Sequence, residues 1–322
     1  MKKSNKTIIS HIPDFLDWID IERGLSNKTQ ENYNRFLRKF SKWLKENNLE
    51  DLKPHQLESE HVWNYRVFLA RSSGNGRILK KTTQNYYLIA LRAFLNFFAA
   101  RDIEALPAEK VELAKQKKDK KVEFLKLEEV EKLLHAPDVS TLVGIRDRAI
   151  MEILFSTGLR VNELVSLNRK QFKNNKFEDG TIELSIIGKG NYPRIVYFSE
   201  RCVGWLQKYL NIRDALMGPG AIDDSLLINF RGAQKSKRLS ARSVENIIKK
   251  YALQSGLSLG TTPHTLRHSF ATDLLNQGAD LRTVQEFLGH QNIATTQIYT
   301  HVTNKRLKDL HQRFHGGKKI RD

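Results

Sequence analysis

The feature that most constrains the fold is a break in apolar periodicity between residues 106 and 125. This stretch, LPAEKVELAKQKKDKKVEFL, contains a proline, is dense in lysine and is almost free of aromatic residues. Because such a segment buries little apolar surface, it predicts an exposed basic linker over residues 105–122. A solvated charged face is the plainer alternative for the same lysines. With 322 residues, the chain is long enough for a domain on each side of the linker.

The residues before the linker have the spacing of amphipathic helices. In residues 26–48, apolar side chains recur at i, i+3, i+4 and i+7, with lysines and arginines on the opposite face. Further helices are predicted near residues 15–19, 61–70 and 81–102, and RSSGNGR is predicted to be a loop. Four or so helices predict a small bundle over residues 1–104.

The residues after the linker mix helical and strand patterns. TIELSII and RIVYFS alternate or are β-branched, and the intervening GKGNYP predicts a β-hairpin with a glycine-rich turn. SLLINF, residues 225–230, predicts a further short strand, and helices account for most of the remainder to residue 304. The predicted fold class is mainly α with a small antiparallel β-sheet: a helical bundle followed by a mixed α/β domain over residues 123–304.

The charge balance indicates a polyanionic partner. The chain has 54 lysines and arginines against 36 aspartates and glutamates, which gives a formal net charge of +18. An excess of this size is typical of proteins that bind nucleic acid, and a basic surface without a partner is the alternative. Forty per cent of the residues are apolar, which excludes a disordered chain.

The cysteine content and the apolar runs bear on the compartment. Cys202 is the single cysteine, so no disulfide can form within the chain, and its apolar neighbours predict a core position. The apolar residues after the basic N-terminus are too few for a signal peptide, and no run approaches the length of a membrane span. We therefore expect a cytoplasmic protein that does not enter a membrane.

Two helix starts place cationic side chains where anions bind. Thr262 and Pro263 suit the N-cap and first position of a helix, which puts His264 and Arg267 on one face near its N-terminus. Free N–H groups and the helix dipole favour an anion there. Arg160 stands at another helix start, after a turn at Gly158, with Glu163 three residues further on.

This combination suits chemistry at a phosphodiester. Two arginines can bind the two non-bridging oxygens and bind them more strongly as charge develops in the transition state. A tyrosine has a pKa near 10, so only about 0.1% is phenolate at neutral pH, and attack on phosphorus needs nearby cations and a base. A lysine at the hairpin tip, such as Lys189, can protonate the departing oxygen. No metal ion or other cofactor is then required.

Each residue also has a plainer explanation when taken alone. Arg160 suits a helix-start salt bridge to Glu163, and Lys189 suits a solubilising turn. His264 and His268 have the i, i+4 spacing of a zinc-binding helix, but no HExxH motif is present. We therefore expect no metal site at these histidines.

Several motifs taken together resemble one family. STGLRVNEL, GKG in a predicted hairpin, HTLRHSFAT, LGH and TTQIYTH occur in this order and are similar to the tyrosine recombinases, also called the phage integrase family. The similarity is greatest to its Xer-type, site-specific members. LSNKTQENYNRFLRKFSKWL and KTTQNYYLIALRAFLNFF also resemble the family's helical core-binding domain, so the resemblance spans nearly the whole chain.

Carried over by position, the resemblance implies six catalytic residues and one supporting residue. They are Arg160 and Arg267 as the phosphate clamp, Lys189 as general acid, His264 as base or hydrogen-bond partner, His290 as donor to a non-bridging oxygen, Tyr299 as nucleophile, and Glu163 as support for Arg160. The reaction that this implies forms a 3′-phosphotyrosyl bond, frees a 5′-hydroxyl and needs no cofactor.

The resemblance also implies an assembly. Its fold is a C-shaped clamp around duplex DNA, made by a core-binding domain at residues 1–104 and a catalytic domain at residues 123–304. Four protomers, identical or of two paralogous kinds, hold two DNA sites and exchange strands through a Holliday junction. The tail at residues 305–322 carries a short amphipathic pattern that is expected to dock on a neighbouring protomer, with packing on its own protomer as the alternative.

The biological role and the DNA contacts are less constrained by the sequence. Resolution of chromosome or plasmid dimers is the expected role, and integration of a small mobile element, relaxation of supercoils by a type IB topoisomerase, and DNA binding without catalysis are alternatives. Candidate DNA contacts come from basic residues on two predicted helices. They are Arg35, Lys39 and Lys42 on the second helix, and Arg242 and Lys249 on the helix SARSVENIIKK.

Overall fold

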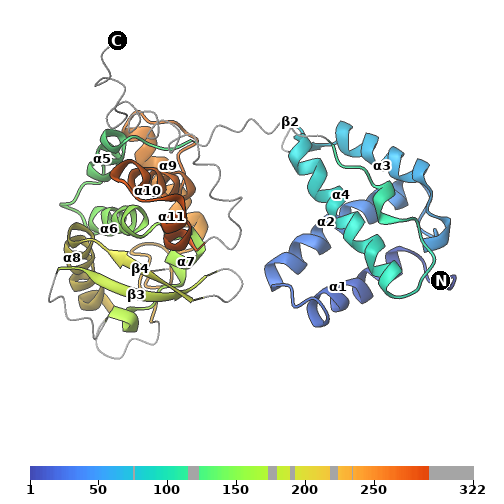
Figure 1. The fold of residues 1–322 in the computed structure, drawn as a ribbon, viewed down its shortest axis with the longest axis horizontal. Coiled ribbons are helices and arrows are strands. Elements are labelled where there is room, and N and C mark those ends of the chain that lie inside the picture. Colours follow the sequence, from blue (N-terminus) through green and yellow to red (C-terminus); the bar gives the residue numbers. More distant parts are fainter. Residues whose placement is uncertain are drawn as a thin grey trace, which may run out of the picture. The chain divides into compact units, whose positions relative to one another are not determined.

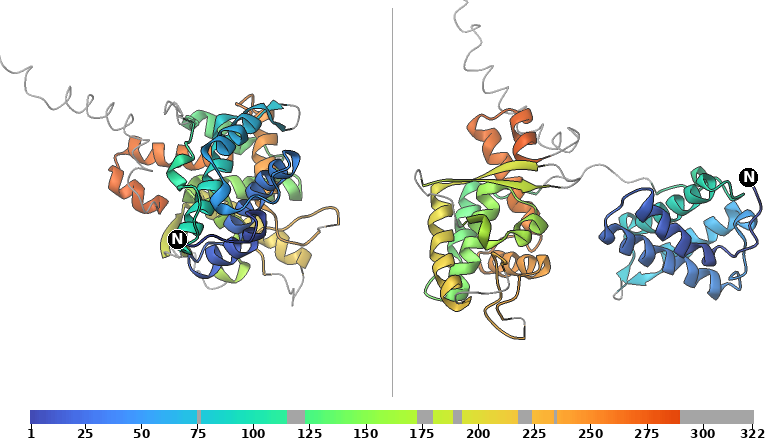
Figure 2. Two further views of the ribbon diagram at one scale, coloured as in Figure 1. Left: turned by 90° about the vertical axis from the view of Figure 1, so that its right-hand side faces the viewer. Right: turned by 90° about the horizontal axis from the view of Figure 1, so that it is seen from below.

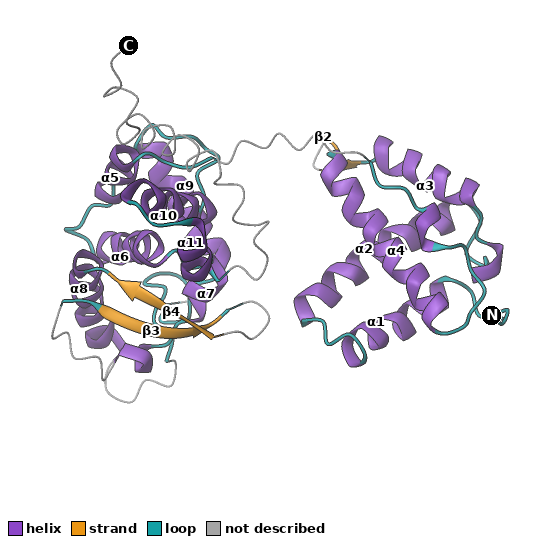
Figure 3. Ribbon diagram, viewed as in Figure 1, coloured by secondary structure: helices purple, strands orange, loops and turns teal. Residues whose placement is uncertain are grey.

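The chain forms two compact units, Met1–Lys120 (unit 1) and Lys121–Asp322 (unit 2). A computed structural model describes residues 1–74, 77–114, 123–172, 180–188, 193–217, 224–233 and 235–289. Within these ranges, helices make up most of both units, and the strands form short hairpins (Figure 3). Among the helices of these ranges, none has the length and apolar character needed to cross a membrane.

Unit 1 is a helical bundle, as the periodicity predicts (Figure 1). Its elements are η1 (Ile9–His11), α1 (Ile12–Ile21), α2 (Asn27–Glu46), η2 (Pro54–Gln56), α3 (Ser59–Arg71), β1 (Ser73–Gly74), β2 (Arg77–Ile78), α4 (Lys81–Ala100) and η3 (Ala108–Lys110). The long helices α2 and α4 pack against each other. The segment RSSGNGR, predicted to be a loop, instead holds β1 and the start of β2, two short antiparallel strands in which Ser73 lies opposite Ile78.

The apolar stripe predicted for α2 is confirmed in the core of unit 1. Phe40 and Trp43 are no more than 3% exposed, and both rings pack against the ring of Tyr65 on α3. Phe15 from α1 meets Phe94 from α4 at a ring-centroid distance of 5.3 Å. Aromatic side chains from four helices therefore hold this unit together.

The start of the predicted linker differs from the expectation of an exposed segment. Ala108 and Val111 are 5% and 0% exposed and belong to the core of unit 1. Asn85 on α4 fixes the chain further along, because its amide donates to the Ala114 carbonyl at 3.0 Å and its carbonyl accepts from the Ala114 N–H at 2.9 Å. The 3-10 helix η3 gives Ala108 and Val111 an i, i+3 spacing that turns both inward. Residues 115–122 lie outside the described residues.

Unit 2 packs helices around one β-hairpin. Its elements are α5 (Leu127–His135), α6 (Leu142–Thr157), α7 (Val161–Ser166), η4 (Arg169–Phe172), β3 (Ile182–Ile187), β4 (Pro193–Phe198), α8 (Glu200–Met217), α9 (Ala241–Gln254), α10 (Pro263–Gln277) and α11 (Leu281–Leu288). The antiparallel hairpin is confirmed, with Ile182 opposite Phe198 and Ile187 opposite Pro193. Strand β4 contacts α6 and α11 (Figure 2).

Helix α6 is the central helix of unit 2 and is buried on almost all sides. Ile150, Ile153 and Leu154 are each 0% exposed, and α8 and α10 both pack against this helix. Cys202 at the start of α8 is also 0% exposed, so its predicted core position is confirmed. A helix enclosed in this way gives the site below a rigid base, because few side chains around it can move independently.

The short strand predicted at residues 225–230 is wrong. Only isolated bridges form there, from Ser225 to Asn168 and from Ile228 to Arg238. The backbone bonds of this segment go to two different partners, since Leu226 donates to Leu167 and Leu239 donates to Leu227. An apolar run that changes partner between Leu226 and Leu227 makes a buried connection, and sequence periodicity does not separate this case from a strand.

Candidate active site

A sharp turn after α6 positions Arg160. Gly158 ends α6 with a φ of +61°, the left-handed conformation that favours glycine. A side chain there would also meet the ring of Phe270 on α10, because an added Cβ would lie 2.5 Å from a ring carbon. The chain then turns back into α7 with Arg160 as its N-cap residue. The predicted helix end at Gly158 is therefore confirmed, and it sets where Arg160 stands.

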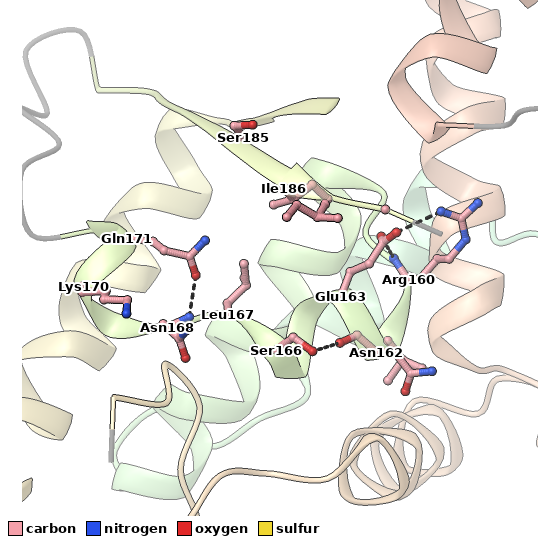
Figure 4. Close-up of a pocket in the computed structure, with 13 residues that line it drawn as sticks. Arg160, Asn162, Glu163, Ser166, Leu167, Asn168, Lys170, Gln171, Ser185 and Ile186 are labelled. Atoms are coloured by element: carbon pink, nitrogen blue, oxygen red, sulfur yellow. Dashed lines mark hydrogen bonds and ion pairs between the residues drawn. The ribbon is translucent and has the colours of Figure 1, made fainter. Parts of the chain in front are cut away.

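Glu163 holds both the backbone and the side chain of Arg160. The Glu163 carboxylate accepts from the Arg160 backbone N–H at 2.8 Å and from Nη1 of its guanidinium at 2.9 Å. Figure 4 shows the carboxylate of Glu163 between these two groups. The predicted i, i+3 contact is present, and it leaves 31% of the Arg160 side chain exposed.

Arg267 joins three helices at the same place. Helix α10 begins as predicted, with Thr262 as N-cap and Pro263 in its first turn. Arg267 is 2% exposed, and its guanidinium donates to the carbonyls of Gly158, at the end of α6, and of Leu288, at the end of α11. The sequence predicts a phosphate ligand at this position, and the structure adds that the same guanidinium fixes the helices around it.

The two arginines converge on the C-terminal end of α11. Nη2 of Arg160 donates to the carbonyl of Gly289 at 3.4 Å, next to the Leu288 carbonyl that Arg267 binds at 2.6 Å. The end of a helix carries partial negative charge, which favours cations there. Arg160 and Arg267, 107 positions apart in the sequence, are therefore brought to one point of unit 2.

Two histidines lie along α10 beside these arginines. His264 is exposed, and its ring centroid lies 4.5 Å from that of His268. Part of the His264 ring is nevertheless shielded from water by its neighbours, and this desolvation, together with the positive charges of Arg267 and Arg160, lowers the pKa of His264 below its usual value of 6.5. Burial, His264 and Arg267 lower the pKa of His268 to about 4. Protonation of both rings is therefore disfavoured, and a neutral His264 ring has a nitrogen that can accept a proton.

The site contains one more arginine that the sequence interpretation missed. Arg194 on β4 binds both carboxylate oxygens of Glu163, with Nη1 at 2.9 Å from Oε1 and Nη2 at 2.7 Å from Oε2. Its side chain is only 8% exposed. The signal that could have found it is the strand alternation, because Arg194 has the same parity as the buried Val196 and Phe198.

The two arginines control the ionisation of Glu163. Burial alone would raise the pKa of this carboxyl, but the hydrogen bonds and positive charges of Arg194 and Arg160 lower its pKa to about 2. Glu163 is therefore a carboxylate throughout the physiological range, and it carries one negative charge between two guanidinium groups.

A pocket of about 700 Å³ opens beside Arg160. Its walls come from α7, η4 and β3, and they carry mostly polar side chains (Figure 4). Arg160 and Lys170 are the cationic side chains among its lining residues. In the parts of the chain that the structure describes, no group of three or more His, Cys, Asp or Glu residues is arranged to hold a metal ion.

Three predicted catalytic residues lie outside the described residues. They are Lys189, His290 and Tyr299. Their roles stay predictions, as does the docking of the tail at residues 305–322. The described elements nevertheless lead to two of these positions, because β3 ends two residues before Lys189 and α11 ends two residues before His290.

The five candidate DNA contacts lie on the surfaces of α2 and α9. Arg35 and Lys42 are exposed, and Lys39 is half-buried with its amino group 5.2 Å from the ring centroid of Phe68. Arg242 and Lys249 are exposed on α9. Their positions suit contacts with a large ligand, and their roles stay predictions.

Comparison with known proteins extends these observations over both units. The family model described as the phage integrase family matches residues 123–306, and the model of the phage integrase N-terminal SAM-like domain matches residues 12–102. The tyrosine recombinase XerD of Listeria monocytogenes is 39% identical over 310 residues, which cover 94% of this chain and 98% of that protein. The XerD of Pseudomonas aeruginosa is 37% identical over 310 residues, or 94% and 96% of the two chains.

A solved structure agrees with these sequence matches. The chain is similar to the XerH site-specific recombinase bound to palindromic difH substrate in a post-cleavage complex, with a TM-score of 0.68 and 25% identity over 96% of each chain. The similarity therefore covers both units, and the match of the phage integrase family model over residues 123–306 includes Arg160 and Arg267. The chain belongs to the phage integrase family and, within it, to the Xer-type tyrosine recombinases, which are enzymes of site-specific DNA recombination.

Proposed function

We propose that this recombinase cuts and rejoins double-stranded DNA at a specific site through a covalent bond between Tyr299 and a 3′ phosphate. The observation that carries the proposal is the convergence of Arg160 and Arg267 at the end of α11. Two guanidinium groups at one point form a site for the two non-bridging oxygens of a single phosphodiester. The helix that ends there leads directly into the segment that holds His290 and Tyr299.

The reaction follows from the protonation states of these groups. The hydroxyl oxygen of Tyr299 attacks the phosphorus while its proton passes to His264, which is neutral because its pKa is lowered. The bond from phosphorus to the 5′ oxygen breaks, and Lys189 donates a proton to that oxygen. Arg160, Arg267 and His290 stabilise the charge that develops on the non-bridging oxygens.

Strand exchange is the reverse of the same chemistry. A 5′-hydroxyl from the partner DNA attacks the phosphotyrosyl bond, the tyrosine oxygen leaves, and the phosphodiester forms again. Because one phosphoester replaces another at each step, the reaction needs no cofactor or nucleotide. Exchange of one pair of strands at a time passes through a Holliday junction.

The DNA substrate is held by both units in this proposal. The basic residues of α2 and α9 contact the duplex, and the net charge of +18 supplies the attraction to its phosphates. The XerH structure, which is bound to a difH substrate, supports a recombination site as the ligand. Four protomers, of one kind or of two paralogous kinds, assemble on two such sites.

Resolution of chromosome or plasmid dimers in the cytoplasm is the biological role that we assign. Relatives at 37% and 39% identity over nearly their whole length are named XerD. These matches favour the Xer role over integration of a mobile element and over a type IB topoisomerase.

Covalent trapping tests the chemistry. The chain is incubated with nicked duplexes of candidate recombination sites, without metal ion or nucleotide, and is run on a denaturing gel beside the Tyr299→Phe variant. We expect a protein–DNA adduct with the wild-type chain and none with the variant. Tight binding to several sites without any adduct, or an adduct that persists in Tyr299→Phe, would contradict the proposal. A synthetic Holliday junction then separates strand exchange from simple relaxation.

A further inference from the structure

The phosphate-binding arginine belongs to a cluster that has more positive than negative charge. Glu163 accepts from Arg160 through Oε1 and from Arg194 through both oxygens. If Arg194 were absent, Arg160 and Glu163 would form a neutral ion pair. With Arg194 present, the three side chains carry a net charge of +1, and the exposed member of the cluster is Arg160.

We propose that Arg194 is a positioning residue for DNA cleavage, which acts through Glu163 on Arg160. This inference rests on the proposed function, since it takes Arg160 as a ligand of the scissile phosphate. Arg194 neutralises the charge of Glu163, so the guanidinium of Arg160 keeps its attraction for an anion. Because both Nη groups of Arg194 donate to the Glu163 carboxylate, its effect reaches Arg160 through that carboxylate.

The geometry gives Arg194 a second effect on Arg160. Its two parallel hydrogen bonds fix the plane of the Glu163 carboxylate, as bidentate arginine–carboxylate pairs do. The carboxylate in turn fixes Nη1 of Arg160, while Nη2 reaches the Gly289 carbonyl. A guanidinium held at both nitrogens has few orientations left, so less conformational freedom is lost when it binds a phosphate.

Gly289 lets Arg194 enter this position. Its φ is +61°, and a Cβ added to it would lie 2.7 Å from Cδ of Arg194. The side chain of Arg194 therefore packs directly on the backbone of the turn that ends α11. The glycine of the LGH motif and the arginine of β4 form one contact, which places Arg194 beside the point where Arg160 and Arg267 converge.

The chain offers a matched control at a second shared carboxylate. Glu152 on α6 accepts from Arg148 at 2.9 Å and from Arg201 at 3.0 Å, so it too lies between two arginines. Neither arginine contacts Arg160, Glu163 or Gly289 through any hydrogen bond or ion pair recorded within the described ranges. Arg201→Met removes one arginine from a shared carboxylate outside the proposed site, as Arg194→Met does within it.

The experiment measures single-turnover cleavage at saturating DNA for the wild-type chain, R194M, R194K and R201M. Each is tested on an ordinary scissile phosphate and on a methylphosphonate, in which a methyl group replaces one charged oxygen. We expect R194M to slow cleavage of the ordinary phosphate by about 10- to 100-fold, the usual effect of losing a supporting partner, with unchanged DNA affinity. R194K recovers part of the rate, and R201M cleaves like the wild-type chain.

The methylphosphonate separates a positioning role from a structural one. It has no charge for Arg160 to bind, so the difference between R194M and the wild-type chain should largely disappear on it. Equal losses on both substrates, or R194M that cleaves the ordinary phosphate at the wild-type rate, would overturn the inference alone. A wild-type chain that forms no Tyr299-dependent adduct at any site would overturn the proposed function and this inference with it.

Discussion

Unit 2 contains two glutamates that each bind two arginines, and the two clusters differ in which arginine is exposed. They are the open cluster, Arg160, Glu163 and Arg194, and the closed cluster, Arg148, Glu152 and Arg201. In the open cluster, the exposed arginine points to the end of α11, where Arg267 also binds. Because the guanidinium of Arg267 lies at the same point, an anion bound there would be attracted by two positive charges.

The closed cluster uses the same ion pairs to join helices. Arg148 is 4% exposed, donates to the carbonyl of Leu134 on α5 and lies 5.0 Å from the ring centroid of Trp205 on α8. The exposed arginine of this cluster, Arg201, lies in the first turn of α8 with 53% of its side chain in solvent. The comparison teaches that a carboxylate shared by two arginines does not by itself indicate an anion-binding site. What indicates such a site is that the exposed arginine lies beside a second cation.

The largest expected difference between the clusters is in the cleavage rate and the free energy of unfolding after one arginine of each cluster is removed. Arg160→Ala should slow Tyr299-dependent cleavage by about 100- to 1,000-fold, because one donor to the charged transition state is lost. Its free energy of unfolding should fall by only about 1 kcal/mol or less, since Glu163 keeps Arg194 and Arg160 is partly exposed.

Arg148→Ala should have the opposite profile. It removes the buried partner of a carboxylate that is 1% exposed and the bond to the Leu134 carbonyl, and it leaves Glu152 only Arg201, which is half in solvent. The expected cost is about 3–5 kcal/mol of stability, while the folded fraction cleaves at the wild-type rate. Single-turnover trapping and amide hydrogen exchange of α6 measure the two quantities. A stable Arg148→Ala chain that fails to cleave would show that the closed cluster also serves the reaction.

The pH dependence of stability gives the next largest effect and concerns the open cluster. The pKa of Glu163 is lowered from 4.5 to about 2 in the folded chain, so its contribution to stability is complete above pH 4.5 and is lost as the pH falls towards 2. This loss amounts to at most about 3 kcal/mol. In Glu163→Gln, the free energy of unfolding should fall less steeply over the same window.

Hydrogen exchange of the α6 amides at a series of pH values measures this difference for unit 2 alone. Asp280→Asn is a suitable control, because the pKa of Asp280 is also lowered, by hydrogen bonds from Thr283 at an exposed helix cap. Identical pH slopes for the wild-type chain and Glu163→Gln would mean that the arginines do not hold this carboxyl ionised.

The sequence predicts one half of the open cluster and misses the other for a physical reason. Arg160 and Glu163 are three residues apart at a helix start, where local geometry brings them together. Arg194 comes from a strand 31 positions after Glu163, and only the tertiary packing of β4, which contacts α6 and α11, brings the two together. Strand alternation indicates that Arg194 turns inward, but it does not name its partner.

The difference between local and distant contacts also explains which other sequence predictions agree with the structure and which do not. The hairpin and the helix ends at Gly158 and Thr262 depend on neighbouring residues, and they occur as predicted. The strand expected at residues 225–230 and the exposed linker expected from residue 105 depend on distant partners. Asn85 fixes residue 114 from 29 positions away, and no local pattern encodes that contact.

A smaller effect should be visible at His264 in the absence of DNA. Arg267 and Arg160 contribute to the lowered pKa of His264, after the effect of burial. Removing a positive charge makes the protonated ring more favourable, so Arg160→Ala should raise the pKa of His264 towards 6.5. Arg148→Ala, in the closed cluster, should leave it unchanged. NMR titration of the histidine rings, with the His264 signal assigned from His264→Gln, measures the pKa of His264 in both variants. An equal change of this pKa in Arg160→Ala and Arg148→Ala would contradict the separation of the clusters.

The smallest effect is expected at the exposed member of the closed cluster. Arg201 has 53% of its side chain in solvent, and exposed ion pairs contribute about 0–1 kcal/mol. Arg201→Met should therefore change the free energy of unfolding by less than about 1 kcal/mol, while Arg194→Met, at 8% exposure, should cost more. Hydrogen exchange of α6 in the two variants provides the comparison. Both arginines share a carboxylate with another arginine, so the two variants differ mainly in the exposure of the side chain that is removed. A larger loss of stability for Arg201→Met would mean that exposure does not determine how much each ion pair contributes to stability. The distinction between the open and closed clusters would then have to rest on their positions alone.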